Sequence, residues 1–282
     1  MDNPENSVAE MAARLIAHIR PLKSVAVAFS GGVDSAVVAM AAHLALNDQA
    51  VAVTAVSPSL AASDRDSARK EAERIGIRHV EIETTEFERA EYRRNSGDRC
   101  FYCKDTLYTA ATLRMGTPGA AAILNGANTD DQGDHRPGMR AAADHQVRSP
   151  LIECGFNKSA VRQLARYWNL SVAEKPASPC LASRVAYGVE VTEERVRMIE
   201  AAEAFLKALL NEEVLRVRVE AGDLARIELP LSQLHHLTDE SSRNRIVQHF
   251  RSLGFRTVTL DLEGFRSGNL NQMLPLVQLG GQ

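Results

Sequence analysis

The stretch Ser30-Gly31-Gly32-Val33-Asp34-Ser35 stands between two apolar segments, residues 25–29 and residues 36–42. This order predicts a buried strand, a tight loop and a helix. The two glycines can adopt positive φ and let backbone N–H groups approach a ligand closely. The first turn of the helix adds unpaired N–H groups and the positive end of the helix dipole. Together with the two serine hydroxyls, these groups predict an anion-binding site.

Asp34 distinguishes this loop from a simple phosphate-binding loop, because a carboxylate repels a neighbouring polyanion. Its presence is explained if a divalent cation also binds there, or if the carboxylate orients the loop. The spacing matches neither Gly-x-x-x-x-Gly-Lys-Ser/Thr nor Gly-x-Gly-x-x-Gly. The loop is therefore neither a Walker A loop nor a dinucleotide-binding loop.

The sequence around this loop predicts a doubly wound α/β fold. A helix is expected over residues 7–19, further strands at 51–56, 79–84 and 121–124, and an amphipathic helix at 64–75. Alternating strands and helices indicate a parallel sheet with helices on both faces, and ligands bind at the carboxyl ends of such strands. That edge would carry the loops at residues 30–35, 57–63, 95–103 and 125–140.

The pattern changes after about residue 189. A long helix is expected from residue 192, followed by two strands at 214–220 and 224–229, a helix at 240–253 and a strand at 257–262. This order predicts a smaller α+β domain. We therefore expect a nucleotide-binding domain over residues 1–187 and a substrate-binding and oligomerisation domain over residues 188–282.

Composition limits the classes of function. The 282 residues include 33 Lys and Arg and 36 Asp and Glu, for a net charge of −3, and only 5% are aromatic. A near-neutral chain with few aromatic side chains is a poor candidate for nucleic-acid binding. The N-terminal residues lack a signal-peptide pattern, and the sequence contains no apolar run long enough to span a bilayer. A cytoplasmic protein without a membrane partner is the expectation.

Three of the four cysteines lie in segments that indicate chemistry. Cys100 and Cys103 open a predicted helix, where the dipole favours thiolates, as in half a zinc site, part of an iron–sulfur site or a thioredoxin-like pair. Cys180 lies in a proline-stiffened segment four residues before Arg184, a permanent charge that could lower the thiol pKa or hold a substrate anion. Cys154 has apolar neighbours and is expected to be an inert packed thiol.

Two further segments carry candidate binding residues. The polar segment after the fourth strand contains Asn125, Asp130, Asp131, Asp134 and Arg136, and at least one of these aspartates is expected to be only a solvated turn residue. In the smaller domain, Arg216 and Arg218 share one face of a predicted strand. Paired guanidinium groups suit a nucleotide phosphate. The alternative is an exposed strand face whose charge is balanced by Glu220.

The loop at residues 30–35 resembles the pyrophosphate loop of the N-type ATP pyrophosphatases, which split ATP between the α and β phosphates and form an adenylated intermediate. The cysteine pair, the segment 125–138 and the segment Pro179-Cys180-Leu181-Ala182-Ser183-Arg184 add to this likeness. Together they resemble the LarE family over nearly the whole chain. LarE proteins are sulfur transferases that help to build the nickel-pincer nucleotide of lactate racemase.

The resemblance implies a reaction. The enzyme would use ATP to adenylate a carboxylate of pyridinium-3,5-dicarboxylate mononucleotide, releasing pyrophosphate, and sulfur would then displace AMP to leave a thiocarboxylate. Catalytic roles would fall to Cys180, Asp34 and Arg184, with a magnesium ion facing Asp34. Arg216 and Arg218 would bind the substrate phosphate, and Glu228 would bind metal. The residues implied to hold ATP and pyrophosphate are Ser30, Gly31, Gly32, Val33, Asp34, Ser35, Asn125 and Asp130.

The family has two forms, which differ in the source of sulfur. In the form with one relevant cysteine, the residue that matches Cys180 attacks the acyl-adenylate, gives up its sulfur and becomes dehydroalanine. This sequence also has Cys100 and Cys103 and resembles the three-cysteine form, in which three thiolates hold a [4Fe–4S] cluster. One iron then lacks a protein ligand and can carry a hydrosulfide from a sulfur donor. We expect Cys180 to be a cluster ligand, and the resemblance also implies a homo-oligomer.

Other functions remain open at the level of sequence. A tRNA thiolase can combine a pyrophosphate loop with three cysteines on a cluster, but the near-neutral charge argues against it. An amide-forming synthetase of the NAD or GMP type would also use such a loop, although no glutaminase module accompanies it here. A non-catalytic metal- or nucleotide-binding protein is the third alternative. Turnover of ATP to AMP that requires a second substrate would exclude the last of these.

Overall fold

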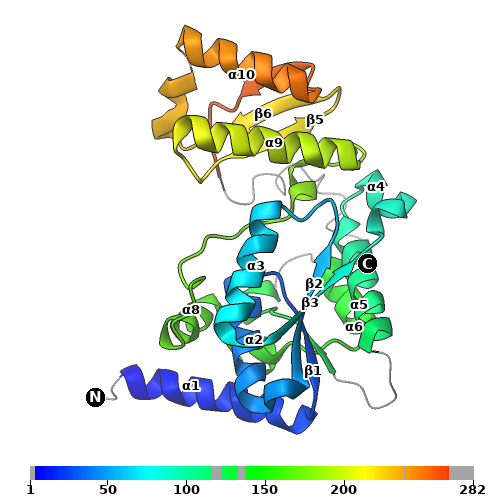
Figure 1. Cartoon of the computed structure of the whole chain (residues 1–282), viewed down its shortest axis with the longest axis vertical. Coiled ribbons are helices and arrows are strands. Elements are labelled where there is room, and N and C mark those ends of the chain that lie inside the picture. The colour runs from blue at the N-terminus through cyan, green and yellow to red at the C-terminus, as the bar shows by residue number, and fades with distance from the viewer. Residues whose placement is uncertain (1–3, 116–121, 133–136, 238, 267–282) are drawn as a thin grey trace. The chain divides into compact units, whose positions relative to one another are not determined.

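The computed structural model describes residues 4–115, 122–132, 137–237 and 239–266 (Figure 1). The chain forms two compact units. The first unit consists of residues Met1–Glu86 and Cys100–Ser178, and the second of Phe87–Arg99 and Pro179–Gln282.

These units differ from the expected domains of residues 1–187 and 188–282. Residues 179–187 fold with the second unit because their backbone pairs with its sheet: Ala186 N–H donates to the carbonyl of Val219 at 2.9 Å. Residues 87–99 join the same unit because the buried Asn95 amide donates to the carbonyls of Val185, Ala186 and Val189. Hydrogen bonds between segments so far apart in the sequence cannot be predicted from its periodicity.

The first unit is built on a parallel four-stranded sheet in the order β3-β2-β1-β4. In its register, Val25 lies opposite both Ala50 and Ala122. The strands are β1 (Val25–Ala28), β2 (Ala50–Val56), β3 (Arg78–Glu83) and β4 (Ala122–Leu124). The helices that accompany them are α1 (Pro4–Ile19), α2 (Val33–Leu46), α3 (Ala62–Ile75), α5 (Arg99–Met115), α6 (Pro137–Asp144), α7 (Pro150–Glu153) and α8 (Lys158–Tyr167).

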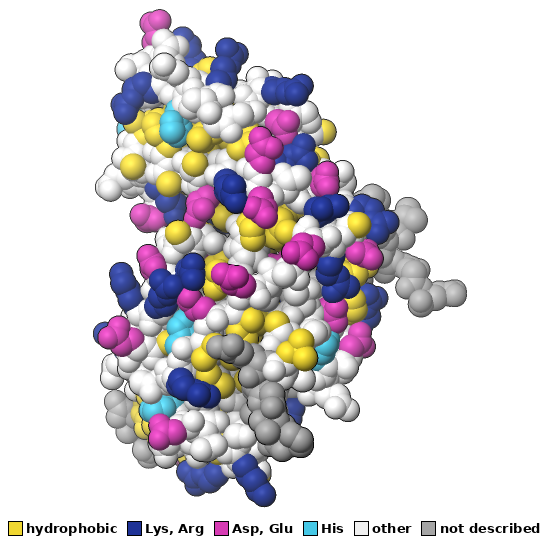
Figure 2. Space-filling model, turned by 45° about the vertical axis from the view of Figure 1, so that its right-hand side comes forward, with side chains coloured by type: hydrophobic (Ala, Val, Ile, Leu, Met, Phe, Trp, Pro, Cys, Tyr) yellow, Lys and Arg dark blue, Asp and Glu magenta, His cyan; other side chains and the backbone are white. Residues whose placement is uncertain are grey.

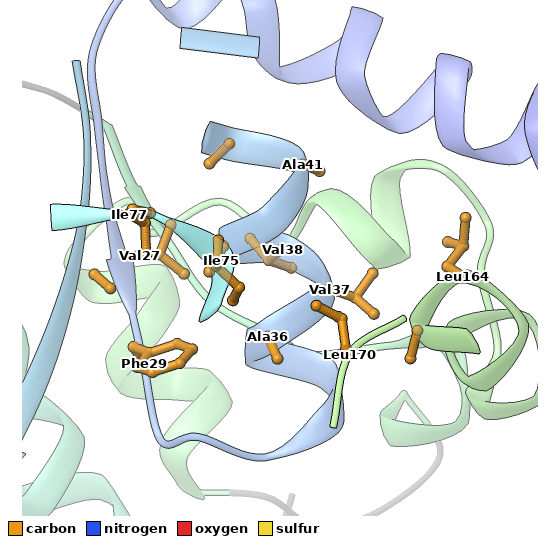
Figure 3. Close-up of a cluster of buried hydrophobic side chains, with 14 of the residues drawn as sticks. Val27, Phe29, Ala36, Val37, Val38, Ala41, Ile75, Ile77, Leu164 and Leu170 are labelled. Atoms are coloured by element: carbon orange, nitrogen blue, oxygen red, sulfur yellow. The ribbon is translucent and has the colours of Figure 1, made fainter. Parts of the chain in front are cut away.

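Both faces of this sheet are covered by helices, which confirms the doubly wound α/β fold. Val27 and Phe29 of the β1 segment face a core shared with α1, α2, α3 and α8 (Figure 3). Ala26 faces the opposite side, where Leu107 of α5 and Ala141 of α6 pack. α2 is apolar along almost its whole surface, and such helices are buried in the interior of a domain.

The second unit contains a three-stranded sheet in the order β5-β6-β7, with α9 and α10 packed on it. Val217 and Val219 of β5 are fully buried, whereas the alternate positions carry charges. Thr192 caps α9 by accepting a hydrogen bond from Arg195 N–H. The elements are α4 (Ala90–Arg94), α9 (Glu193–Leu210), β5 (Arg216–Glu220), β6 (Leu224–Glu228), α10 (Glu240–Leu253) and β7 (Thr257–Leu260).

Most expected elements lie within a few residues of their predicted ends, and α3 ends as expected at Ile75, followed by Gly76 as its C-cap with a φ of 80°. Short 3-10 turns connect the remaining elements: η1 (Arg20–Leu22), η2 (Asn47–Gln49), η3 (Glu86–Glu88), η4 (Thr129–Asp131), η5 (Leu181–Arg184) and η6 (Leu231–Leu237). Among the described residues, none of the helices is long and apolar enough to cross a membrane.

Candidate active site

The loop that follows β1 has the conformation expected for an anion-binding loop. Gly31 adopts a φ of 69°, and a Cβ at this position would lie 2.8 Å from the backbone of Ala68 in α3. The Ser35 hydroxyl donates to the carbonyl of Gly32 at 3.0 Å. Since that uses its single proton, the Ser30 hydroxyl donates to Ser35 Oγ across 3.2 Å. The loop therefore requires glycine at position 31 and two hydroxyls that hold each other in place.

The N-terminus of α2 is the anion-binding element of this site. The first bond of the helix runs from Ala36 N–H to the carbonyl of Gly32 at 3.0 Å. Helix geometry offers the N–H groups of Val33, Asp34 and Ser35 no acceptor within the helix. They lie at the carboxyl end of β1, which has β2 on one side and β4 on the other. This is the switch point of the sheet, where ligands bind in doubly wound folds.

The segment after β4 packs directly against the start of α2. A Cβ on Gly126 would lie 2.7 Å from the backbone nitrogen of Ser35 and 2.9 Å from the carbonyl carbon of Asp34. Asn128, which is 3% exposed, donates from Nδ2 to Asp34 Oδ1 at 3.1 Å. The two loops therefore form one site at the switch point.

We expect Gly126→Ala to weaken nucleotide binding and to lower the free energy of unfolding by about 1–3 kcal/mol, the usual cost of overpacking. The new methyl group would push the segment after β4 away from the N–H groups of α2. Urea unfolding would measure the loss of stability, and titration with ATP would measure binding. Gly155→Ala is the control, because a Cβ there has no neighbour within 4 Å, although its φ of 68° adds strain. Equal ATP affinity in both variants would contradict the packing argument.

Two of the acidic residues after β4 stabilise the turn itself. Asp131 Oδ2 accepts from Asn128 N–H, and Asn128 Oδ1 accepts from Asp130 N–H, each at 3.0 Å. Asp130 Oδ2 accepts from the N–H of Lys158 at 3.0 Å. Asn125 Oδ1 accepts from Ala127 N–H at 3.0 Å and from the Ser149 hydroxyl at 2.9 Å. The predicted residues Asp134 and Arg136 lie outside the described residues.

Lys158 is a site residue that the sequence analysis missed. It is the first residue of α8, and its Nζ lies 2.5 Å from Asp34 Oδ2. The Asp34 carboxylate therefore has a cation beside it, as its place in an anion-binding loop requires. The sequence gives little indication of this role. Lys158 directly follows Asn157, the N-cap of α8, and belongs to no known sequence motif. Only the fold brings α8 to the start of α2.

A polar group is also buried beneath the loop. Thr54 of β2 donates from its hydroxyl to the carbonyl of Phe29 at 2.7 Å, and His79 Nε2 lies 2.8 Å from the same hydroxyl. Since the hydroxyl proton goes to Phe29, His79 is the donor in the second bond. Burial lowers the pKa of His79. The neutral imidazole thus fixes the end of β1 from which the loop starts.

The cysteines of the first unit differ in their surroundings. Cys100 and Cys103 lie in the first turn of α5, Cys100 exposed and Cys103 half-buried, and neither is in a disulfide. Cys154 is half-buried between α7 and α8, and burial raises the pKa of its thiol. A raised pKa keeps Cys154 protonated, in agreement with the expected inert thiol.

The segment around Cys180 is held by its backbone in the second unit. Arg184 Nη1 donates to the carbonyl of Cys180 at 2.9 Å and also to that of Pro179. Glu203 of α9 binds the other side of this guanidinium, at 3.0 Å from Nε and 3.3 Å from Nη2. The Arg184 guanidinium is buried and paired, so it orients the backbone of the exposed Cys180. The sequence predicted that Arg184 would lower the pKa of the Cys180 thiol or hold a substrate anion. The contacts in the structure are instead with backbone carbonyls and with Glu203.

Arg218 and Glu228 form a buried pair rather than two separate binding groups. Arg218 donates from Nε and Nη2 to the two oxygens of Glu228, both at 2.9 Å, and from Nη1 to the carbonyl of Ser183 at 3.1 Å. Arg226 Nη1 also donates to Glu228, at 2.7 Å. Because Glu228 is fully buried and binds two guanidinium groups, this arrangement does not suit a metal ligand. Across the described ranges, no cluster of His, Cys, Asp and Glu is arranged to bind a metal ion.

The surroundings of Arg216 differ from those of Arg218. Its side chain is half-buried, and its guanidinium carbon lies 5.2 Å from the centre of the Phe265 ring. Nη1 donates to the carbonyl of Leu215 at 2.6 Å. Of the two predicted phosphate-binding arginines, Arg216 is thus the more accessible.

Comparison with known proteins assigns the chain to a family. Residues 13–112 match the asparagine synthase family. A pyridinium-3,5-bisthiocarboxylic acid mononucleotide synthase of Lactiplantibacillus plantarum is 36% identical over 275 residues, 97% of this chain and 98% of that protein. The chain belongs to the LarE family. LarE proteins are ATP-dependent sulfur transferases of the N-type ATP pyrophosphatase superfamily, so the chain is an enzyme that uses ATP.

Two further relatives match most of the chain. An uncharacterized protein of Synechocystis sp. is 42% identical over 248 residues, 88% of this chain and 92% of that protein. An uncharacterized protein of Methanocaldococcus jannaschii is 25% identical over 245 residues, 87% of this chain and 92% of that protein. These matches extend through both units.

Proposed function

We propose that this LarE protein adenylates a carboxylate of pyridinium-3,5-dicarboxylate mononucleotide and converts it to a thiocarboxylate. The observation that carries the proposal is the likeness to the Lactiplantibacillus plantarum synthase over 97% of the chain. The arrangement of the pyrophosphate loop at the start of α2 supports the ATP-dependent half of the reaction. In the first step the carboxylate attacks the α phosphorus of ATP, and pyrophosphate leaves.

The residues at the switch point suit the release of pyrophosphate. The N–H groups of Val33, Asp34 and Ser35 would bind its oxygens, the hydroxyl of Ser30 would join them by turning its proton from Ser35 Oγ to the ligand, and Lys158 would supply a positive charge. Asp34 offers a hard carboxylate oxygen of the kind that Mg²⁺ prefers, and its ion pair with Lys158 supports the binding of a cation at this position. A magnesium ion there would neutralise charge on the phosphates. Asn128 would keep the carboxylate oriented toward the ion.

In the second step sulfur replaces AMP on the activated carboxylate. A sulfur nucleophile attacks the acyl carbon, the bond from that carbon to the AMP oxygen breaks, and AMP and a thiocarboxylate result. Arg216 would bind the substrate phosphate, and Arg218 would support the Cys180 segment through Ser183. The Glu203–Arg184 pair would hold the Cys180 backbone while sulfur is transferred.

We propose that Cys100, Cys103 and Cys180 hold a [4Fe–4S] cluster. Thiol ligands are the donors that such clusters require, and none of the three cysteines is in a disulfide. Cys100 and Cys103 are one helical turn apart at a helix N-terminus, where the dipole favours thiolates. A cluster bound by three thiolates supplies an iron without a protein ligand, on which an external hydrosulfide can be carried. The protein would then keep its cysteines and turn over repeatedly.

Iron and acid-labile sulfide content, measured on protein purified without oxygen, tests this assignment. We expect a cluster in the wild type and in Cys154→Ala, and loss of iron in Cys100→Ala, Cys103→Ala and Cys180→Ala. Cys154→Ala is the matched control because its thiol lies outside the proposed ligand set. An iron-free wild type after anaerobic reconstitution would overturn the cluster.

A second candidate is the sacrificial form of sulfur transfer, which the exposure of Cys180 favours. Cys180 would attack the acyl-adenylate, and cleavage of its Cβ–Sγ bond with loss of the α proton would leave dehydroalanine. Mass spectrometry after one turnover distinguishes the two, because only this form lowers the mass of the protein by one H₂S.

A tRNA thiolase is a weaker candidate. Figure 2 shows acidic and basic side chains interspersed over the described surface of one face, where RNA binding would call for a continuous basic surface. A gel shift with tRNA that depended steeply on salt would favour this alternative.

A further inference from the structure

Helix α3 carries a row of polar side chains on one face. Asp64, Ser67, Glu71 and Arg74 are spaced by three, four and three residues, so they lie along one side of the helix. The adjacent face, with Ala68, Ala72 and Ile75, is buried in the core of the first unit. The polar row borders this core and contacts a second segment of the chain.

That second segment is residues 169–178, here named the strap. Arg74 Nη1 donates to the carbonyl of Asn169 at 3.1 Å, and the Ser171 hydroxyl donates to Glu71. Further along, Lys175 Nζ donates to Asp64 Oδ1 and to the Ser67 hydroxyl, each at 3.1 Å. As the strap proceeds from residue 169 to residue 175, its contacts move along the row from Arg74 back to Asp64. The strap therefore runs along α3 in the opposite direction.

Asp64 makes the contacts at the far end of the strap. Its Oδ1 accepts from Lys175, and its Oδ2 accepts from the hydroxyl of Ser178 at 2.8 Å. A single carboxylate thus binds the strap at two points three residues apart. Replacing it leaves an ammonium group and a hydroxyl without their common partner.

Glu71 shows that the contact with the strap is specific. Its side chain is 1% exposed, and its Oε1 has no hydrogen-bond partner among the described residues. A buried carboxylate costs stability unless it is bound. The other oxygen of Glu71, Oε2, accepts a hydrogen bond from the Ser171 hydroxyl. The strap therefore supplies a hydrogen bond that this buried carboxylate requires.

The strap leads directly to Cys180. Ser178 is the last residue of the first unit, and Cys180 follows after Pro179. Pro176 and Pro179 each fix φ near −65° and restrict the residue before them. With so few rotatable bonds between Ser178 and Cys180, a displacement of Ser178 is passed on to the cysteine.

We propose that Asp64 is a positioning residue for sulfur transfer, acting through Lys175 and Ser178 on the segment that carries Cys180. This role rests on the proposed function and adds a residue to its second step. Asp64 lies in the first turn of α3, and both of its carboxylate oxygens bind the strap, through Lys175 and Ser178. Its loss therefore affects transfer and spares adenylation.

The test compares Asp64→Asn with Asp66→Asn, a carboxylate on the same helix that pairs with Arg69 and not with the strap. Two rates are measured for each protein: ATP–pyrophosphate exchange in the presence of substrate, and thiocarboxylate formation. We expect Asp64→Asn to lower thiocarboxylate formation by about tenfold to a hundredfold, the range for misplacement of a reacting group. Exchange should stay near the wild-type rate, and Asp66→Asn should match the wild type in both.

Hydrogen exchange and a charge-reversal variant distinguish a positioning role of Asp64 from a general loss of folded structure. In Asp64→Asn, backbone amides of residues 169–178 should exchange faster while those of α2 stay protected. The double variant Asp64→Lys with Lys175→Asp should recover transfer relative to Asp64→Lys alone. Lys175→Met, which breaks the same contact from the strap, should reproduce the defect if Asp64→Asn proves unstable.

Equal loss of exchange and transfer, or wild-type transfer in Asp64→Asn, would overturn the positioning role. A wild type that performs neither reaction with this substrate would instead overturn the proposed function.

Discussion

Cys180→Ser should abolish thiocarboxylate formation and leave ATP–pyrophosphate exchange within about twofold of the wild type, because a residue needed only for transfer affects only that step. An oxygen in place of sulfur is a poor ligand for iron and a weak nucleophile at neutral pH. Either proposed mechanism of sulfur transfer therefore fails. The contacts of Arg184 go to carbonyl groups of the backbone, so the segment itself keeps its anchors.

Exchange is measured with labelled pyrophosphate, and thiocarboxylate by mass spectrometry of the nucleotide. Cys154→Ser is the matched control, since it changes the same atom in a cysteine with a raised pKa that lies outside the proposed site. Normal thiocarboxylate formation in Cys180→Ser would contradict both the cluster and the sacrificial mechanism. Loss of exchange as well would mean that Cys180 supports adenylation.

The fold of the first unit could be predicted from the sequence because its signals are local. The apolar run 25–29, the glycines at 31 and 32 and the apolar helix that follows each restrict their own backbone. Side chains from both sides of β1 are buried, as a continuous apolar run predicts. The order β3-β2-β1-β4 then places the loops after β1 and β4 together.

The partners of the charged residues could not be predicted, because they come from segments far apart in the sequence. Asp34 meets Lys158 only after α8 packs beside α2, and Arg184 meets Glu203 through the fold of the second unit. Arg216 and Arg218 look alike in the sequence, and the register places Glu228 opposite Arg216, yet Arg218 forms the two-bond pair with Glu228. Periodicity places a side chain on a face and does not identify its partner.

Asp34→Asn should lower ATP–pyrophosphate exchange by about a thousandfold, the upper end of the effect of removing one electrostatic contact to a transition state. The carboxamide keeps an oxygen that can accept from Asn128, but it loses the negative charge that pairs with Lys158 and would hold a magnesium ion. Without that ion, the charge that builds on the departing pyrophosphate is poorly stabilised. Thiocarboxylate formation should fall to the same extent, since it depends on the acyl-adenylate.

The control for this variant is Asp48→Asn, an exposed carboxylate just beyond the opposite end of α2. It changes the same functional group beside the same helix, without a place in the loop. Urea unfolding of both variants would show that the fold is retained. If Asp34→Asn kept its exchange rate and its response to magnesium concentration, the carboxylate would serve only to orient the loop. A loss of exchange with unchanged stability would mean that Asp34 acts in the release of pyrophosphate, because the ion pair with Lys158 is too exposed to account for more than about 1 kcal/mol of stability.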